Sequence, residues 1–221
     1  MEGYYPDPNR WERQADPERQ HPLDEYGRLA DWFAPCCDSR HFIHVDLALN
    51  RDAAGIAMAH QPVPGCPYYE AKEAQPNAKK VVLDLCGRFI PGPSGEIDFE
   101  SVRQLIRDLQ DRGFNVKGGG VTFDGWQSVD SQQILRKEGF RTGTLSVDRD
   151  LVAHDTLQEL INTDQLSFYA HPVLLKEARH LRLLKGAKVD HPPGSSKDMI
   201  DAVAGAVFRA YEKGGRMAFV G

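Results

Sequence analysis

The chain has 221 residues, of which 41% are hydrophobic and 27% are charged, and its formal net charge is −5 at pH 7. This composition suits a globular protein with a sizeable core. It argues against binding to nucleic acid by bulk positive charge, although a local basic patch is compatible with it. No apolar stretch approaches the roughly 20 residues of a membrane span, and the N-terminus lacks a signal-peptide core. We therefore expect a cytosolic protein with no membrane partner.

The first third of the chain predicts an arm followed by strands. Residues 1–38 are rich in Pro, Asp, Arg and Glu and predict an N-terminal arm with a short helix in DEYGRLADWFA, ahead of a folded domain over 39–221. The runs HFIHVDL (41–47) and AAGIAMAH (53–60) are β-permissive and five residues apart, which predicts an antiparallel hairpin. After a proline-bearing loop, VVLDLCGRF (81–89) predicts a third strand.

Helical and strand patterns alternate in the rest of the chain. DFESVRQLIRDLQDRGF (98–114) opens on an Asp cap and places Val102, Leu105, Ile106 and Leu109 at helical spacing. Strands are predicted at 116–125, 141–147 and 166–171, helices at 128–140, 150–164 and 172–181, a second hairpin at 181–191, and a Ser-capped helix at 195–215 that is stopped by glycines. Together these elements predict an α/β fold with a mixed sheet.

Aspartates stand where several of these elements could meet. Asp46 follows the strand HFIHV and Asp124 follows GGGVTF, and residues at the carboxyl ends of neighbouring strands converge on one crevice. Asp198 and Asp201 lie three apart in the first turns of the last helix, on one face. Such a cluster is costly unless divalent cations neutralise it, and oxygen-only ligands favour Mg²⁺ or Mn²⁺. Ordinary helix-end and turn roles explain Asp198 and Asp124 equally well, so the pattern alone indicates only metal-dependent phosphoryl chemistry.

The thiols and imidazoles gave a different expectation. Cys36, Cys37, Cys66 and Cys86 show no C-x-x-C spacing, and an adjacent pair suits neither a disulfide framework nor a tetrahedral zinc site. The eight histidines form no H-x-x-x-H pair. We therefore expect reduced, inert thiols and no zinc. Asp84, within VVLDLC, is interpreted as an outward-facing strand residue.

Three segments resemble a known family. HVDLALNRDAAGIAMAH, VTFDGWQSVDSQQILRKEGF and SSKDMIDAVAGAVFRAY together resemble the nuclease domain of tailed-bacteriophage terminase large subunits, of the RNase H-like, RuvC-like superfamily. The resemblance runs from about residue 40 to 213, and KDMIDAVAGAV is its most specific piece. It implies an RNase H-like mixed β-sheet flanked by helices, with an additional β-hairpin.

The resemblance also implies roles for particular residues. Asp46 resembles the ligand on the first strand, Asp124 the ligand on the fourth strand, and Asp198 and Asp201 the acidic helix pair. Asp52 matches an accessory acidic position. Ser196-Lys197-Asp198 stands where many relatives have His-Asp-Asp, so which member of the helix pair binds metal stays open.

The activity implied is a Mg²⁺- or Mn²⁺-dependent endonuclease that cuts concatemeric double-stranded viral DNA during packaging, with two ions bound alongside the substrate. For DNA contacts, the basic run RHLRLLKGAK offers Arg179, Arg182, Lys185 and Lys188. A solvated surface hairpin explains that run as well.

The partners implied by the resemblance are those of a packaging motor. The chain has no G-x-x-x-x-G-K-[ST] loop, so we expect it to match the nuclease half only, with the ATPase removed or encoded separately. The resemblance then implies an ATPase domain, a portal and a small terminase subunit as partners, in the cytoplasm of the infected bacterial host. Two alternatives stay open: another RNase H-like nuclease, of junction-resolvase or RNase H type, and a non-catalytic docking domain of a packaging motor.

Overall fold

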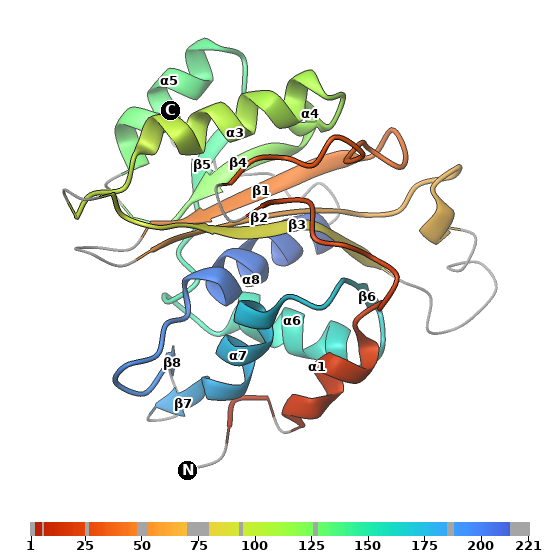
Figure 1. Cartoon of the computed structure of the whole chain (residues 1–221), viewed down its shortest axis with the longest axis vertical. Coiled ribbons are helices and arrows are strands. Elements are labelled where there is room, and N and C mark those ends of the chain that lie inside the picture. Colours follow the sequence, from red (N-terminus) through yellow and green to blue (C-terminus); the bar gives the residue numbers. More distant parts are fainter. Residues whose placement is uncertain are drawn as a thin grey trace.

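A central mixed sheet with helices on both faces organises the chain (Figure 1). The computed structural model describes residues 3–5, 7–24, 27–47, 53–69, 80–92, 95–125, 128–184 and 188–212. Within them, six strands form the sheet in the order β5-β4-β1-β2-β3-β6. β2 runs antiparallel to its neighbours β1 and β3, and all other neighbouring pairs are parallel. β7 and β8 form a separate antiparallel hairpin.

The strands are β1 (Arg40–Asp46), β2 (Ala54–His60), β3 (Val81–Phe89), β4 (Gly120–Phe123), β5 (Thr142–Thr144), β6 (Leu166–Ser167), β7 (Arg182–Leu184) and β8 (Lys188–Asp190). The helices are α1 (Pro8–Gln14), α3 (Phe99–Asp111), α4 (Val116–Gly119), α5 (Val129–Lys137), α6 (Val152–Asn162), α7 (Pro172–His180) and α8 (Asp198–Tyr211). Among the described residues, every helix is too short or too polar to span a bilayer.

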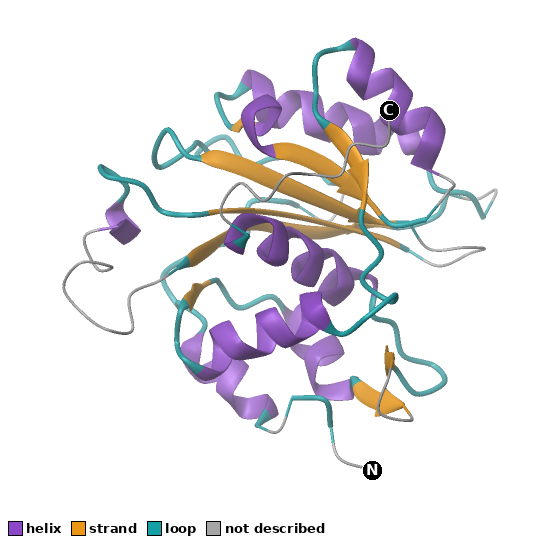
Figure 2. Ribbon diagram, turned by 180° about the vertical axis from the view of Figure 1, so that it is seen from behind, coloured by secondary structure: helices purple, strands orange, loops and turns teal. Residues whose placement is uncertain are grey.

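Two apolar layers hold the helices to the sheet. Side chains alternate between the faces of a strand, and in β1 Ile43 and Val45 point to the layer under α3 while Phe42 points to the layer under α8. Helices α3, α4 and α5 cover one face, and α8, α6, α7 and α1 lie on the other (Figures 1 and 2). The sheet is therefore buried on both sides.

Helix α8 lies directly against the sheet because its sequence is made of small residues. Most of MIDAVAGAV is buried, and a Cβ at Gly205 would lie 2.2 Å from Cδ2 of His44. Only glycine leaves room for that imidazole. The small face thus sets the depth at which α8 packs on β1 and β2.

The predicted α/β class, mixed sheet and first hairpin are confirmed. β1 and β2 pair from His41 with His60 to Asp46 with Gly55. Asp98 caps α3 by accepting from Glu100 N at 3.0 Å, and the four residues predicted for the apolar face of α3 are buried. The second hairpin is also present, as β7 and β8.

Several local predictions were wrong. The predicted strand at 116–125 begins with the short helix α4, and the strand at 166–171 is only the two-residue β6. Lys197, not a serine, precedes α8, and its side chain makes no capping bond. The two glycines predicted to stop this helix lie outside the described residues. In each case the element is set by packing and by the register of its neighbours, which a short local pattern does not encode.

The N-terminal arm packs against the domain. The helix predicted at 24–34 is absent from the described residues there, and α1 forms earlier in the arm, with Asp7 as its N-cap. Trp11 is 1% exposed and meets Phe168 edge-on at 5.5 Å, and α1 contacts α6 and α7. The sequence pattern did not predict α1, because a seven-residue helix with one buried tryptophan is too short to show a helical repeat of apolar residues. That the arm derives from an interdomain linker stays a prediction.

Candidate acidic site

Two of the predicted aspartates lie side by side at one end of the sheet. Asp46 ends β1, and Asp124 directly follows β4, the parallel neighbour of β1. The strands pair through Val45 and Phe123, and Asp124 N donates to Val45 O at 2.9 Å. The backbone register therefore fixes the two aspartates next to each other.

Both side chains belong to the face that α8 covers. Asp46 lies two residues after His44, whose ring packs against α8 at Gly205, and Asp124 lies two residues after Thr122. His44 Nδ1 and Thr122 Oγ1 are 2.9 Å apart on that face. Because strand side chains alternate, residues two apart share a face. Both carboxylates thus project towards the start of α8.

The start of α8 reaches the same point because β2 carries a glycine there. Gly55 pairs with Asp46 across the hairpin, and a Cβ at Gly55 would lie 1.9 Å from the carbonyl oxygen of Asp198. Glu177 of α7 secures the same turn, accepting from Ser196 Oγ at 2.7 Å and from Ile200 N at 2.9 Å. Backbone contact and a buried carboxylate together position the acidic first turn beside Asp46.

Asp201 is the deeper member of the helix pair. It is 2% exposed, and its Oδ1 lies 3.1 Å from Nε2 of His154 on α6. Its Oδ2 forms an ion pair with Lys197. Burial acts to raise the pKa of Asp201, but His154 and Lys197 outweigh it and hold that pKa below the usual value. Asp198, by contrast, is only half-buried.

The aspartates also act on one another. Burial raises the pKa of Asp46 well above the usual range, and the charges of Asp201, Asp124 and Asp198 raise it further, with Lys197 opposing them. Burial likewise raises the pKa of Asp124, against a hydrogen bond from Ser146 that lowers it. All four predicted aspartates are therefore close enough to interact electrostatically.

Sequence patterns did not single out several side chains of this site. Asp148, in the loop after β5, accepts from Lys197 Nζ at 2.6 Å, and His154 and Glu177 support Asp201 and the helix start. Asp148 did carry a signal, since it too follows a strand. His154 and Glu177 carried none, because a polar residue on a helix gains its meaning only from what it packs against.

The described carboxylates are not arranged closely around one ion position. Within the described residues, they form no set of three whose ligand atoms all lie within 4.8 Å of one another. The ammonium of Lys197 forms ion pairs with both Asp201 and Asp148 and neutralises part of their charge. Any divalent ion entering this cluster competes with that ammonium.

The basic hairpin flanks the site but is partly committed to other contacts. Lys188 Nζ lies 3.4 Å from Asp190 and 3.8 Å from Asp148, which directs it towards the acidic cluster. Arg179 instead pairs with Glu12 of α1, and Arg182 donates to the carbonyl oxygens of Arg179 and Leu181 at 3.0 Å. Lys185 and Asp52, both predicted to contribute, lie outside the described residues.

Comparison with known proteins identifies the fold. The Thermus phage P74-26 large terminase nuclease domain superposes with a TM-score of 0.60 at 14% identity, over 92% of this chain and 94% of that one. The large terminase nuclease from thermophilic phage G20c gives 0.56 at 14% identity, over 90% and 93%. The fold is that of a phage large terminase nuclease domain.

Other comparisons set the limits of that likeness. The HK97 bacteriophage large terminase matches with a TM-score of 0.59 at 12% identity, and the match spans 91% of this chain but 42% of the HK97 chain. No protein-family model matches the chain, and no curated protein matches it in sequence. The chain thus shares the fold of these proteins at 12–14% sequence identity.

Proposed function

We propose that this chain is a Mg²⁺- or Mn²⁺-dependent endonuclease that cuts double-stranded viral DNA during genome packaging, as the nuclease part of a terminase large subunit. One observation carries the proposal: β1, β4 and α8 bring aspartates together at one end of a terminase nuclease fold. Structures of the G20c nuclease with bound magnesium, cobalt and zinc are among the fold neighbours, which supports a metal-dependent role for this fold.

The residues present fit divalent cations. The donors are carboxylate oxygens, the ligands that Mg²⁺ and Mn²⁺ prefer. Burial and neighbouring negative charges raise the pKa of Asp46, so a cation would relieve repulsion that the metal-free site carries. We propose Asp46, Asp124 and Asp201 as ligands, with Asp198 next to them. When bound, two ions would activate a water and stabilise the leaving oxygen of the phosphodiester.

The other side chains of the site would prepare it for this chemistry. His154 places its Nε2 3.1 Å from Oδ1 of the Asp201 carboxylate, and the Glu177 carboxylate accepts from the N–H of Ile200, next to Asp201. Lys197 forms ion pairs with Asp201 and with Asp148, and we propose that its ammonium balances the carboxylates and would pair with a substrate phosphate.

DNA and a motor are the proposed partners. Lys188 and Arg182 of the β7–β8 hairpin would contact the phosphate backbone, which positions a duplex without reading its sequence. A net charge of −5 leaves few such contacts. We therefore propose that an ATPase domain, working with a portal and a small terminase subunit in the host cytoplasm, supplies DNA at high effective concentration.

A cleavage assay across substrates and ions tests the proposal. Supercoiled plasmid, linear duplex, a four-way junction and an RNA–DNA hybrid would each be incubated with Mg²⁺, Mn²⁺, Ca²⁺ or EDTA. We expect cleavage of both duplex DNAs with Mg²⁺ or Mn²⁺ and none with EDTA. Preference for the junction or the hybrid would instead indicate a resolvase or RNase H. A folded protein that cleaves nothing with any ion would indicate a docking domain.

A further inference from the structure

A second group of metal-ligating side chains lies at the other end of the sheet. Cys36 and Cys37 precede β1, His60 ends β2, and Cys66 lies in the loop that follows β2. One ligand atom from each lies within 4.8 Å of all the others. This cluster differs from our expectation of inert thiols, since residues up to 30 positions apart are brought together by the β1–β2 pairing.

The distances match a tetrahedral site. Cys36 Sγ lies 3.8 Å from both Cys37 Sγ and Cys66 Sγ, and His60 Nε2 lies 3.7 Å from Cys36 Sγ and from Cys66 Sγ. Zinc bonds of about 2.3 Å to sulfur and 2.0–2.1 Å to nitrogen, at tetrahedral angles, require separations of about 3.8 Å between sulfurs and about 3.6 Å between sulfur and nitrogen. These four separations thus have the lengths that a zinc ion needs, the ligand atom of Cys37 lies within 4.8 Å of those of Cys66 and His60, and all three cysteines are free of disulfides.

The imidazole of His60 is oriented for ligation by a carboxylate behind it. His60 Nδ1 lies 2.8 and 2.9 Å from the two oxygens of Asp84, which leaves Nε2 directed at the sulfurs. Metal-binding histidines almost always use their second nitrogen this way, and the carboxylate fixes the tautomer. The side chains of His60 and Asp84 are 0% and 9% exposed. Asp84 is therefore not the outward-facing strand residue we expected.

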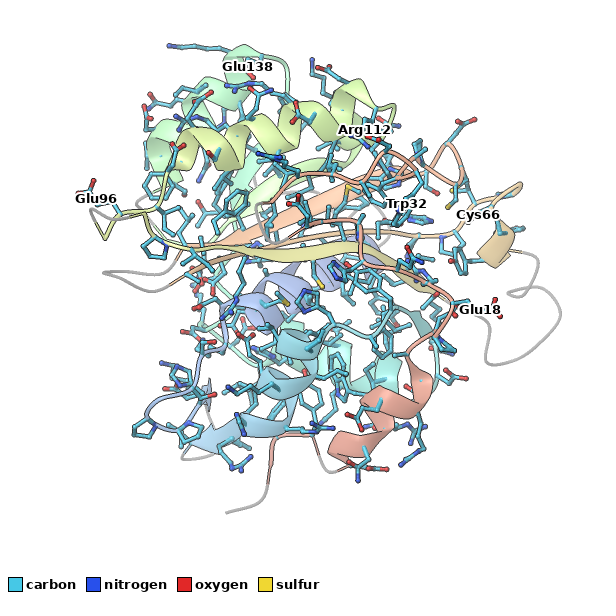
Figure 3. All side chains as sticks on the ribbon, viewed as in Figure 1. Glu18, Trp32, Cys66, Glu96, Arg112 and Glu138 are labelled. Carbon is cyan, nitrogen blue, oxygen red and sulfur yellow. The ribbon has the colours of Figure 1, made fainter. Side chains whose placement is uncertain are left out.

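The cluster is separate from the acidic site in both position and face. His60 pairs with His41 at the start of β1, whereas Asp46 ends that strand. His60 also lies two residues after Met58, on the α3 face of the sheet, while Asp46 faces α8. Glu96 follows the end of β3 that lies near Asp46. In Figure 3, Cys66 and Glu96 lie on opposite sides of the molecule.

We propose that Cys36, Cys37, Cys66 and His60 bind one structural zinc ion. Four protein ligands leave no open position for a substrate, which is typical of structural sites. The segment just before β1 contains no helix, and Ser39 Oγ already ties it to Gln61 O at 2.6 Å. A zinc ion would fasten this segment and the loop after β2 to the sheet, adding to folding stability. The inference stands whether or not the aspartates bind metal.

Metal analysis of the whole chain tests this site. Protein made in zinc-supplemented medium and purified with reductant and without chelator should carry about one zinc per chain. Cys36→Ser and Cys66→Ser should retain less than a tenth of that zinc. Cys86→Ser is the matched control, because Cys86 is a buried free thiol outside the cluster, and Asp46→Asn is the control for the acidic site. Both controls should keep their zinc.

Cobalt substitution supplies a second readout that does not depend on activity. Co²⁺ added to metal-stripped wild type should give thiolate charge-transfer bands and strong visible bands of a tetrahedral ion, both lost in Cys36→Ser. Because Cys36 is exposed, that variant should still fold. Absence of zinc and of cobalt–thiolate bands in folded wild type would overturn the proposal. So would zinc that persists in both cysteine variants but disappears in Asp46→Asn.

Discussion

Substituting Gly55 with Ala should separate α8 from the strand that positions it. The new Cβ would lie 1.9 Å from Asp198 O, and such contacts essentially never fall below 3.0 Å. The helix start must therefore move by at least 1.1 Å, the difference between those two distances. A misplacement of about 1 Å can lower an enzymatic rate about 100-fold. Overpacking of this kind also costs about 1–3 kcal/mol of unfolding free energy.

Plasmid nicking in Mn²⁺ and thermal unfolding measure both effects. At about 2–4 °C per kcal/mol for a chain of this size, Tm should fall by about 2–12 °C, and nicking measured well below that Tm should fall about 100-fold. Gly92→Ala is the matched control, because its Cβ would meet nothing nearer than Glu96 O at 3.9 Å. A Gly55→Ala protein with wild-type nicking would refute a catalytic role for the start of α8.

Three further predictions follow from the site and the hairpin. Mn²⁺ at about 100 times its Kd should add about 2.7 kcal/mol to the unfolding free energy and raise Tm, and Asp46→Asn should abolish this Tm shift. Because burial raises the pKa of Asp46, Asp46→Asn should also stabilise the metal-free protein at pH values above the pKa that Asp46 has in the folded state. A Tm shift in Mn²⁺ that is unchanged in Asp46→Asn would exclude Asp46 as a ligand. Glu177→Ala leaves the buried Ile200 N–H without its acceptor and should cost about 1–3 kcal/mol in denaturant unfolding, so a loss below a few tenths would show that Glu177 does not secure α8. Replacing Arg182, Lys185 and Lys188 with Ala should weaken DNA binding and leave the Tm shift in Mn²⁺ intact. The slope of log affinity against log salt concentration should become shallower by about 0.9 per lost phosphate contact. An unchanged slope would show that the hairpin is a solvated surface that does not contact DNA.

The elements that sequence predicted well are those with long, regular patterns. The four apolar positions of α3 repeat over two turns and all are buried, and β1 and β2 each lie within a run of β-permissive residues. β6 has two residues and α4 has four, so neither is long enough to show a period. Helix α1, which carries Trp11, has only seven residues, and it packs on α6 and α7, which come much later in the chain.

The same contrast holds for the functional residues. Asp46 and Asp124 could be picked out because a strand end is visible in the sequence and parallel neighbours end together. His154 and Glu177 have no such marker, since their roles arise from α6 and α7 packing against α8. The cysteine cluster was hidden for a related reason: Cys36 and Cys66 meet only because the β1–β2 register brings residues before one strand beside residues after the other.

The most direct test of the acidic site is plasmid nicking by Asp46→Asn in Mn²⁺, compared with wild type and with Asp130→Asn. Asp130 is a matched surface control, because its side chain is 79% exposed and lies on α5. We expect Asp46→Asn to remain folded and to lose at least about 100-fold in rate, the scale of removing one preorganised electrostatic group, while Asp130→Asn cleaves at the wild-type rate. Nicking by Asp46→Asn at the wild-type rate would contradict the assignment of DNA cleavage to this end of the sheet.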